Sequence, residues 1–214
     1  MAGLNPRLES AAHRFARVVT RAVVAKPRLW RLFRGPLRKQ FDWLASGWEE
    51  RRGPETLAPL EAALDRLPAP PRRVLDLGTG TGKAARAAAE RFPEAAIFGV
   101  DLSPVMIEEA RRLLPADLVN RVRFQVADSA ALPFVNGEFD LVMLFNMIPF
   151  FDELARVTSR GGHILFAFSS GAGTPIYVPP ETLRERLAPL GFTDFEELAA
   201  GDGTAFLAVR KDPG

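Results

Sequence analysis

The 214-residue sequence contains no cysteine, two histidines and a single tyrosine. Without cysteine the chain can form no disulfide, no thiolate metal site and no cysteine nucleophile, and it gives no sign of a redox compartment. The two histidines, His13 and His163, lie far apart, and neither belongs to a metal-ligand motif such as HExxH. We therefore expect no metal site, so any chemistry must come from other residue types.

Long apolar runs are absent as well. The short ones, such as residues 22–25 and 141–145, fall far below the roughly 18 residues of a membrane-spanning helix. A secretory signal would combine a basic start, an apolar stretch and a small-residue cleavage site, whereas arginine is spread throughout this N-terminus. Serine is too scarce there for a transit peptide. These absences favour a cytoplasmic protein.

Acidic residues are scarce in the N-terminal part. The formal net charge of the chain is only +2, but Glu9 is the single acid among residues 1–40, against many arginines and lysines. Before Pro27, apolar residues recur at helical spacing beside a basic stripe, which predicts an amphipathic helix. The apolar positions are Phe15, Val18, Val19, Ala22 and Val23, and the stripe is Arg14, Arg17 and Arg21. We predict a basic helical extension or cap over residues 1–54 and the main domain over residues 55–214.

From about residue 72 onward, short runs rich in β-branched and aromatic residues alternate with helical stretches. This alternation is typical of a parallel sheet with crossover helices. It predicts strands at 73–77, 97–100, 122–126, 139–145 and 163–168, the last preceded by a turn at 161–162, and helices at 83–91, 104–114 and 181–190. Two further strands, around 192–198 and 204–209, are joined by a hairpin-like turn. We predict an α/β, doubly wound, Rossmann-like sheet of seven strands, mostly parallel with an antiparallel C-terminal hairpin, plus an N-terminal helical extension.

In such sheets ligands bind at the carboxyl ends of the strands, and the stretch DLGTGTGK, residues 76–83, follows the first predicted strand. A phosphate-binding loop of the GxxxxGK[ST] type needs glycine where this chain has Leu77 and a hydroxyl where it has Ala84, and both requirements fail. A dinucleotide-binding GxGxxG loop needs its third glycine where this chain has Lys83, so that match is partial.

A third kind of loop fits every position. Residues 74–82, VLDLGTGTG, resemble the first motif of the class I S-adenosylmethionine-dependent methyltransferases: two apolar strand residues, an acid, and glycines at alternate positions. Glycine lets the backbone turn sharply and approach a cofactor with no Cβ in the way. The resemblance implies that Asp76 pairs with the cationic amino-acid end of the cofactor. It also implies that Gly78, Thr79 and Gly80 line the cofactor.

The resemblance continues at the ends of the next two strands. The sequence GVDLS places Asp101 where the family has an acid that accepts hydrogen bonds from both ribose hydroxyls, a role that suits a carboxylate because it has two accepting oxygens. The sequence VADS places Asp128 where the family contacts the adenine amino group, with Ser129 beside it. Leu102 and Met106 are further candidates for the cofactor site, although Met106 fits the core side of its helix equally well.

The fourth strand ends at Asn146, where the family lines the methyl-transfer pocket. The following order, Asn-Met-Ile-Pro, departs from the [DN]PP[YF] motif of enzymes that methylate amide or adenine nitrogens, which argues against those substrates. His163 stands at the start of its strand, away from the substrate end, and we assign it a structural role. No residue qualifies as a general base, so the catalytic residues stay unassigned.

The resemblance spans residues 72–210. It implies an S-adenosylmethionine-dependent methyltransferase of a small-molecule acceptor, similar to the broad methyltransferase type 11 group that includes quinone-biosynthesis enzymes. The sulfonium of this cofactor is already an activated methyl donor, so the protein's task is to hold the acceptor in line and exclude water. Two alternatives stay open: a non-catalytic binding module that keeps the fold, and an NAD(P)-dependent oxidoreductase.

The basic extension has several candidate roles. In the family that the chain resembles, the N-terminal segment often caps the active site, so we predict a helical cap or a homodimer contact. Alternatively, its basic stripe lies on an anionic membrane surface with the help of Trp30 and Phe33. Binding to nucleic-acid phosphates is the least favoured role.

Overall fold

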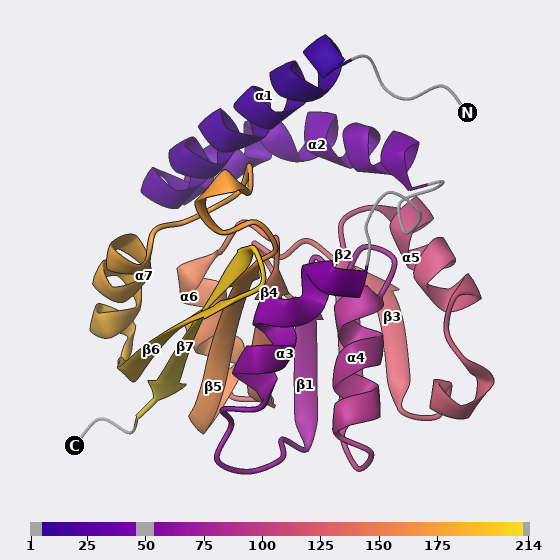
Figure 1. The fold of residues 1–214 in the computed structure, drawn as a ribbon, viewed down its shortest axis with the longest axis vertical. Helices are drawn as coiled ribbons and strands as arrows, with labels where there is room; N and C mark the ends of the chain where they lie inside the picture. Colours follow the sequence, from indigo (N-terminus) through magenta and orange to yellow (C-terminus); the bar gives the residue numbers. More distant parts are fainter. Residues whose placement is uncertain (1–5, 46–53, 212–214) are drawn as a thin grey trace.

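Within the residues that the computed structural model describes, 6–45 and 54–211, seven strands form one sheet in the order β3-β2-β1-β4-β5-β7-β6 (Figure 1). Strands β1 to β5 pair in parallel, and β7 runs antiparallel between β5 and β6. The predicted fold class is therefore confirmed. The strands are β1 Arg73–Leu77, β2 Ala96–Asp101, β3 Val122–Val126, β4 Phe139–Phe145, β5 Thr158–Phe168, β6 Phe192–Ala200 and β7 Gly203–Arg210.

Helices cover both faces of the sheet, and the apolar side chains of each strand divide between them. Val74 packs into the core beneath α3, α4 and α5, whereas Leu75 and Leu77 pack into the core beneath α6 and α7. Burial on both faces explains why these strands read as near-continuous apolar runs. The helices are α3 Ala58–Leu64, α4 Lys83–Arg91, α5 Pro104–Arg112, α6 Phe151–Val157 and α7 Pro180–Leu187, with short 3-10 segments η2 Pro54–Leu57, η3 Ala116–Leu118, η4 Gly171–Gly173 and η5 Ala188–Leu190.

A pair of helices lies across the carboxyl ends of the strands (Figure 1). It consists of α1 Pro6–Ala25 and α2 Trp30–Leu44, joined by η1 Pro27–Leu29, and we call it the N-terminal cap. Its inner side chains form a third apolar cluster with residues that follow β4; the buried members are Val19, Val23, Trp30, Leu37, Ile148 and Phe150. The predicted division at residues 54 and 55 borders the segment 46–53, which lies outside the described residues, so the domain boundary stays a prediction.

The cap differs in detail from the sequence prediction. The helix before Pro27 is confirmed, but Phe15 and Val18 do not face the core: their exposed fractions are 40 % and 63 %. Trp30 is not a surface residue, because its side chain is only 6 % exposed. The second helix continues through Pro36, which is exposed on its outer side.

The main domain also contains features that the sequence pattern did not predict. Strand β5 begins at Thr158 rather than His163, because residues 159–162 form a bulge opposite a single residue of β4 instead of a turn that precedes the strand. Gly161 permits this bulge with a φ of +74°. Helix α6 was not predicted. The helix at Lys83 and the one capped by the Ser103 hydroxyl, which accepts from Met106 N–H at 3.1 Å, begin where predicted.

Candidate functional site

The glycine-rich loop after β1 turns through a series of left-handed backbone conformations. Gly78, Gly80 and Gly82 have φ values of +67°, +53° and +82°, a region that favours glycine. A Cβ on Gly82 would approach the Phe124 ring to 2.6 Å, so this glycine serves helix packing. A Cβ on Gly78 would instead approach the sulfur of Met147 to 2.5 Å, on the side of the loop that faces the end of β4.

Asp76 lies inside the loop rather than on its surface. Its side chain is 1 % exposed, and its Oδ2 accepts a hydrogen bond from the Thr79 hydroxyl at 2.6 Å. Burial raises the pKa of Asp76 to about 7, and the nearby charge of Asp101 adds to this, whereas the Thr79 hydrogen bond opposes it. The carboxyl therefore titrates near neutral pH and shapes the loop through Thr79.

Asp101 ends β2 and is held by backbone donors. Its two oxygens accept from the N–H groups of Gly80 and Ser103, each at 2.9 Å. Burial raises its pKa, against the opposing effect of these hydrogen bonds. Among the described residues, no lysine or arginine forms an ion pair with Asp76 or Asp101. Two neighbouring acids without a cation, Asp76 buried and Asp101 partly buried, suit a positively charged ligand, so these carboxylates fit S-adenosylmethionine.

Asp128, beyond β3, is held by the N-terminal cap. Its Oδ1 accepts from the indole Nε1–H of Trp30 at 2.7 Å and from Ala130 N–H at 3.0 Å. Its Oδ2 lies 3.3 Å from the guanidinium of Arg34, a largely exposed ion pair. The cap therefore contacts directly the acid that the family resemblance assigned to the adenine end of the cofactor.

The remaining predicted cofactor residues lie around these acids. Leu102 packs against the apolar cluster of the cap. Met106 and Ser129 are buried, with exposed fractions of 1 % and 4 %. The hydroxyl of Ser103, which caps α5, also donates to the carboxylate of Asp42 on α2. The cap is thus tied to the ends of both β2 and β3.

Asn146 joins the ends of β4 and β5. Its Nδ2 donates to the Ser169 hydroxyl and its Oδ1 accepts from Ser169 N–H, both at 3.0 Å. Asn146 adopts a φ of +53°, an uncommon conformation for a non-glycine residue that asparagine tolerates better than most. These two hydrogen bonds hold the ends of β4 and β5 together, and we call the surface that Asn146 and Ser169 form there the floor of the site.

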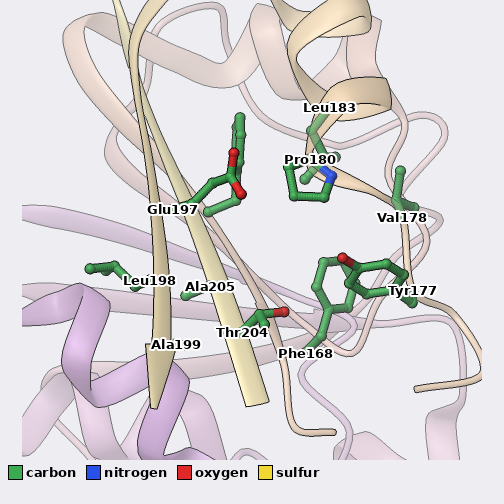
Figure 2. A pocket seen from close by; sticks show the side chains of 11 residues that line it. Phe168, Tyr177, Val178, Pro180, Leu183, Glu197, Leu198, Ala199, Thr204 and Ala205 are labelled. Carbon is green, nitrogen blue, oxygen red and sulfur yellow. The ribbon is translucent and has the colours of Figure 1, made fainter. Parts of the chain in front are cut away.

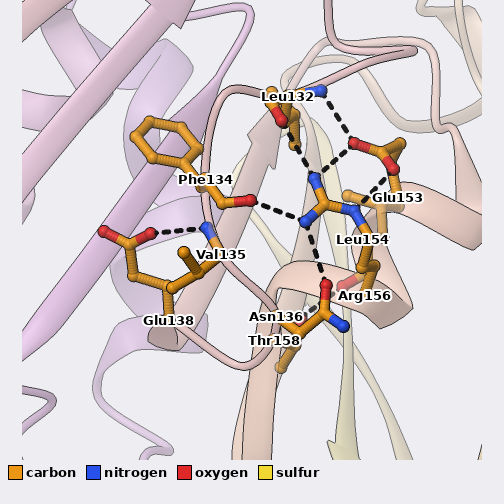
Figure 3. Close-up of polar contacts among 9 residues, drawn as sticks. All are labelled: Leu132, Phe134, Val135, Asn136, Glu138, Glu153, Leu154, Arg156 and Thr158. Atoms are coloured by element: carbon orange, nitrogen blue, oxygen red, sulfur yellow. Dashed lines mark hydrogen bonds and ion pairs between the residues drawn. The ribbon is translucent and has the colours of Figure 1, made fainter.

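The loop of residues 127–138 connects β3 to β4 and contains Asp128. Arg156 of α6 holds this loop by hydrogen bonds (Figure 3). The guanidinium donates to the carbonyl oxygens of Leu132 and Phe134 at 3.0 and 2.6 Å, and it pairs with Glu153 at 2.7 Å. Glu153 in turn accepts from Leu132 N–H at 2.7 Å. The hydrogen bonds from Arg156 lower the pKa of Glu153. This network holds the loop without contribution from the cap.

A cavity of about 220 Å³ opens at the same edge of the sheet, between the β6–β7 hairpin and α7 (Figure 2). Phe168 and Tyr177 line it, and their rings pack edge to face with their centroids 5.0 Å apart. Phe168, which lines the cavity, is the last residue of β5 and immediately precedes Ser169. Burial, with smaller effects of Glu181 and Glu197, raises the pKa of Tyr177, so its phenol stays protonated and can donate a hydrogen bond.

Among the residues that the structure describes, we assign no general base at this edge. His163 lies midway along β5, where it pairs with Leu141 and Val209, and burial lowers its pKa. Within the described residues no cluster of histidines and acids could hold a metal ion. Sequence reasoning missed Trp30 and Arg34 as members of the site, because their partner Asp128 lies far along the chain and no local spacing signals it.

The order of the strands, the glycine-rich loop and the acids at the strand ends define the class of the domain. It has a Rossmann-like methyltransferase fold. Residues 74–162 match a family model described as a methyltransferase domain. Residues 74–162 of the chain therefore form a methyltransferase domain. Within the described residues no helix is both long enough and apolar enough to cross a membrane.

Individual relatives agree with this family. The chain is 34 % identical over 160 residues to a malonyl-[acyl-carrier protein] O-methyltransferase of Halorhodospira halophila, which covers 70 % of this chain and 50 % of the relative. It is 42 % identical over 113 residues to a demethylmenaquinone methyltransferase of Thermus thermophilus, which covers 50 % of each. The chain thus spans about half the length of the curated relatives it matches.

Solved structures support the fold. A SAM dependent methyltransferase from Aquifex aeolicus superposes with a TM-score of 0.65 at 15 % identity, over 78 % of this chain and 98 % of that one. Human N-acetylserotonin methyltransferase in complex with SAM superposes with a TM-score of 0.62 at 19 % identity, over 86 % of this chain and 58 % of that one.

Proposed function

We propose that this protein is an S-adenosylmethionine-dependent methyltransferase that acts on a small-molecule acceptor. The observation that carries the proposal is the pair of acids, the buried Asp76 and the partly buried Asp101, which flank a left-handed glycine loop without a cationic partner among the described residues. The ammonium group of the cofactor would supply the positive charge beside Asp76, and its ribose hydroxyls would donate to Asp101. The family of the domain supports this assignment.

Each predicted residue has a role in this proposal. Asp101 would hold the ribose hydroxyls, Asp128 and Ser129 the adenine, and Asp76 with Gly78, Thr79 and Gly80 the amino-acid end. Leu102 and Met106 would form apolar walls, and Asn146 would form the floor of the methyl-transfer site. The cofactor itself supplies the activated methyl group. The chain's own contribution is to orient the acceptor and exclude water under the cap.

The acceptor is proposed to be an uncharged aromatic or otherwise apolar molecule that occupies the cavity beside Phe168. The rings of Phe168, Tyr177 and Phe206 line that cavity, and Thr204 adds a hydroxyl. Its one carboxylate, Glu197, already forms an ion pair with Arg184, so a charged acceptor finds no free partner of opposite sign among these lining residues. A relative named for demethylmenaquinone supports an aromatic acceptor.

Isothermal titration tests the cofactor. We expect S-adenosylmethionine and its demethylated product to bind with dissociation constants in the micromolar range, and NAD or NADP not to bind. Binding of NAD or NADP alone would instead establish an oxidoreductase. If the donor binds but a panel of phenols, quinols, amines and carboxylates shows no turnover, the protein is a binding module.

A homodimer and a cytoplasmic location remain predictions from the sequence. Light scattering on the purified chain would measure the mass of the assembly, and a monomer at every concentration would exclude the dimer. Cell fractionation would test the location, and no role for nucleic acid is proposed.

A further inference from the structure

The outer face of the N-terminal cap exposes large apolar side chains. Val18 of α1 is 63 % exposed, and Leu32 and Trp43 of α2 are 68 % and 65 % exposed. Phe15 and Phe41 add partly exposed rings. Single exposed apolar residues need no explanation, but within the described residues every exposed aromatic ring and every exposed leucine of this kind lies on this one helix pair.

The same face is strongly cationic. Residues 13–41 contain no acid. Asp42 is half-buried, where its carboxylate accepts a hydrogen bond from Ser103 and lies 4.0 Å from the Arg38 guanidinium.

The exposed basic side chains alternate with the apolar ones along both helices. Arg17 and Arg21 flank Val18, and Arg31 precedes Leu32. Lys26, Arg28, Arg38 and Lys39 extend the positive surface along both helices and the turn between them.

We propose that this outer face docks on an anionic lipid surface. Basic side chains beside exposed tryptophan, phenylalanine and leucine are the features by which a helix lies in the headgroup region, with its charges on lipid phosphates and its apolar side chains in the acyl boundary. Each basic residue near such a surface contributes to the attraction.

Other occupants fit less well. A second copy seated on the same face would bring two cationic surfaces together, which repel each other. A nucleic acid would neutralise the charges, but its phosphates would leave Val18, Leu32 and Trp43 without apolar partners. The membrane is the one partner that satisfies both kinds of side chain.

The position of the docking face gives it a consequence for the site. The outer face belongs to the same helix, α2, whose inner Trp30 holds Asp128. Resting on the proposed function, we infer that docking turns the carboxyl edge of the sheet toward the membrane, with the cap between them, and so brings the site close to the phase in which an apolar acceptor is dissolved. Docking itself does not depend on that function and can be measured separately.

Co-sedimentation of the full chain with vesicles tests the docking. Vesicles of phosphatidylcholine with phosphatidylserine should pellet the protein, vesicles of phosphatidylcholine alone should not, and high salt should release it because screening weakens the attraction. The double variant Arg17→Glu/Arg21→Glu should lower partitioning at least about tenfold. Leu32→Ser/Trp43→Ser should also lower it, although that variant keeps every charge.

The matched control is Arg72→Glu/Arg123→Glu, which changes the net charge by the same amount on exposed residues away from the cap. Its partitioning should equal that of the unchanged protein. Equal loss in this control, equal pelleting with neutral vesicles, or tight binding to duplex DNA that Leu32→Ser/Trp43→Ser leaves unchanged would each overturn the proposal. Donor titration of the same variants reports separately on the proposed function, so the two can fail independently.

Discussion

Asp101 and Asp128 end neighbouring strands of the sheet, yet different parts of the chain hold them. Asp101 accepts hydrogen bonds from the backbone of the glycine loop and of the next turn, within 21 residues of itself. Asp128 accepts from Trp30, which is 98 residues away on the cap, as well as from the nearby Ala130. One carboxylate is therefore positioned by the fold of the domain, whereas the other is positioned by the cap together with Ala130.

The largest expected effect comes from removal of the acid that the domain itself positions. Asp101→Ala should weaken donor binding roughly 100-fold, because two hydrogen bonds to a charged acceptor are lost at about 1.5 kcal/mol or more each. Calorimetry measures the affinity, and circular dichroism checks folding. Asp117→Ala, an exposed acid on η3, is the control. Unchanged affinity in Asp101→Ala would refute the cofactor assignment.

A second test uses pH and concerns Asp76, which the domain positions without the cap. Because the pKa of Asp76 is about 7 and a cationic donor favours the ionised acid, donor affinity should rise about tenfold from pH 6 to pH 8. Asp76→Asn should flatten this part of the profile. A profile that is identical in the variant would show that Asp76 does not sense the donor.

The same group affects the stability of the donor-free protein. Since the pKa of Asp76 is raised from 3.8 to about 7 in the folded state, the folded protein binds more protons than the unfolded chain between these values. The contribution of Asp76 to stability is therefore complete below pH 3.8 and is lost as the pH rises through about 7. Denaturant unfolding of the unchanged protein against Asp76→Asn measures this difference.

Loss of the hydrogen bond from the cap to Asp128 should have a smaller effect on donor binding. Trp30→Phe keeps the ring against Phe150, whose centroid lies 5.2 Å away, and removes only the donor to Asp128. Loss of one such bond at a partly exposed site should weaken donor binding roughly fivefold. Amide hydrogen exchange in α1 and α2 should become faster in this variant and stay unchanged in Asp101→Asn. Equal exchange in both would remove the distinction between the two acids.

The smallest effect is expected at Lys83. It begins α4, and its ammonium lies 3.4 Å from the Thr56 hydroxyl rather than in the glycine loop. Lys83→Ala should therefore change donor affinity by less than about twofold, within the range of a surface substitution. A large loss would revive the phosphate-loop interpretation that Leu77 and Ala84 excluded.

The sequence predicted the parts of the molecule that depend on local pattern. Strands buried on both faces, the glycine spacing and the acid that follows each strand are all encoded within a few residues of one another. The pairing of Trp30 with Asp128 could not be found in this way, because it depends on how two helices seat on the finished sheet. The outward direction of Val18 is similar: helical spacing shows an apolar face, but the sheet decides which apolar residues it covers.

Met147 gives the glycine loop a chemical vulnerability. A Cβ on Gly78 would lie 2.5 Å from the Met147 sulfur. Met147 is half-buried, whereas Met106 and Met143 are at most 1 % exposed. Peroxide converts an accessible thioether into a polar, bulkier sulfoxide, which methionine sulfoxide reductases reverse. In a chain without cysteine, we therefore expect oxidation at Met147, among the methionines that the structure describes, to disturb the glycine loop, and reduction of that sulfur to restore it.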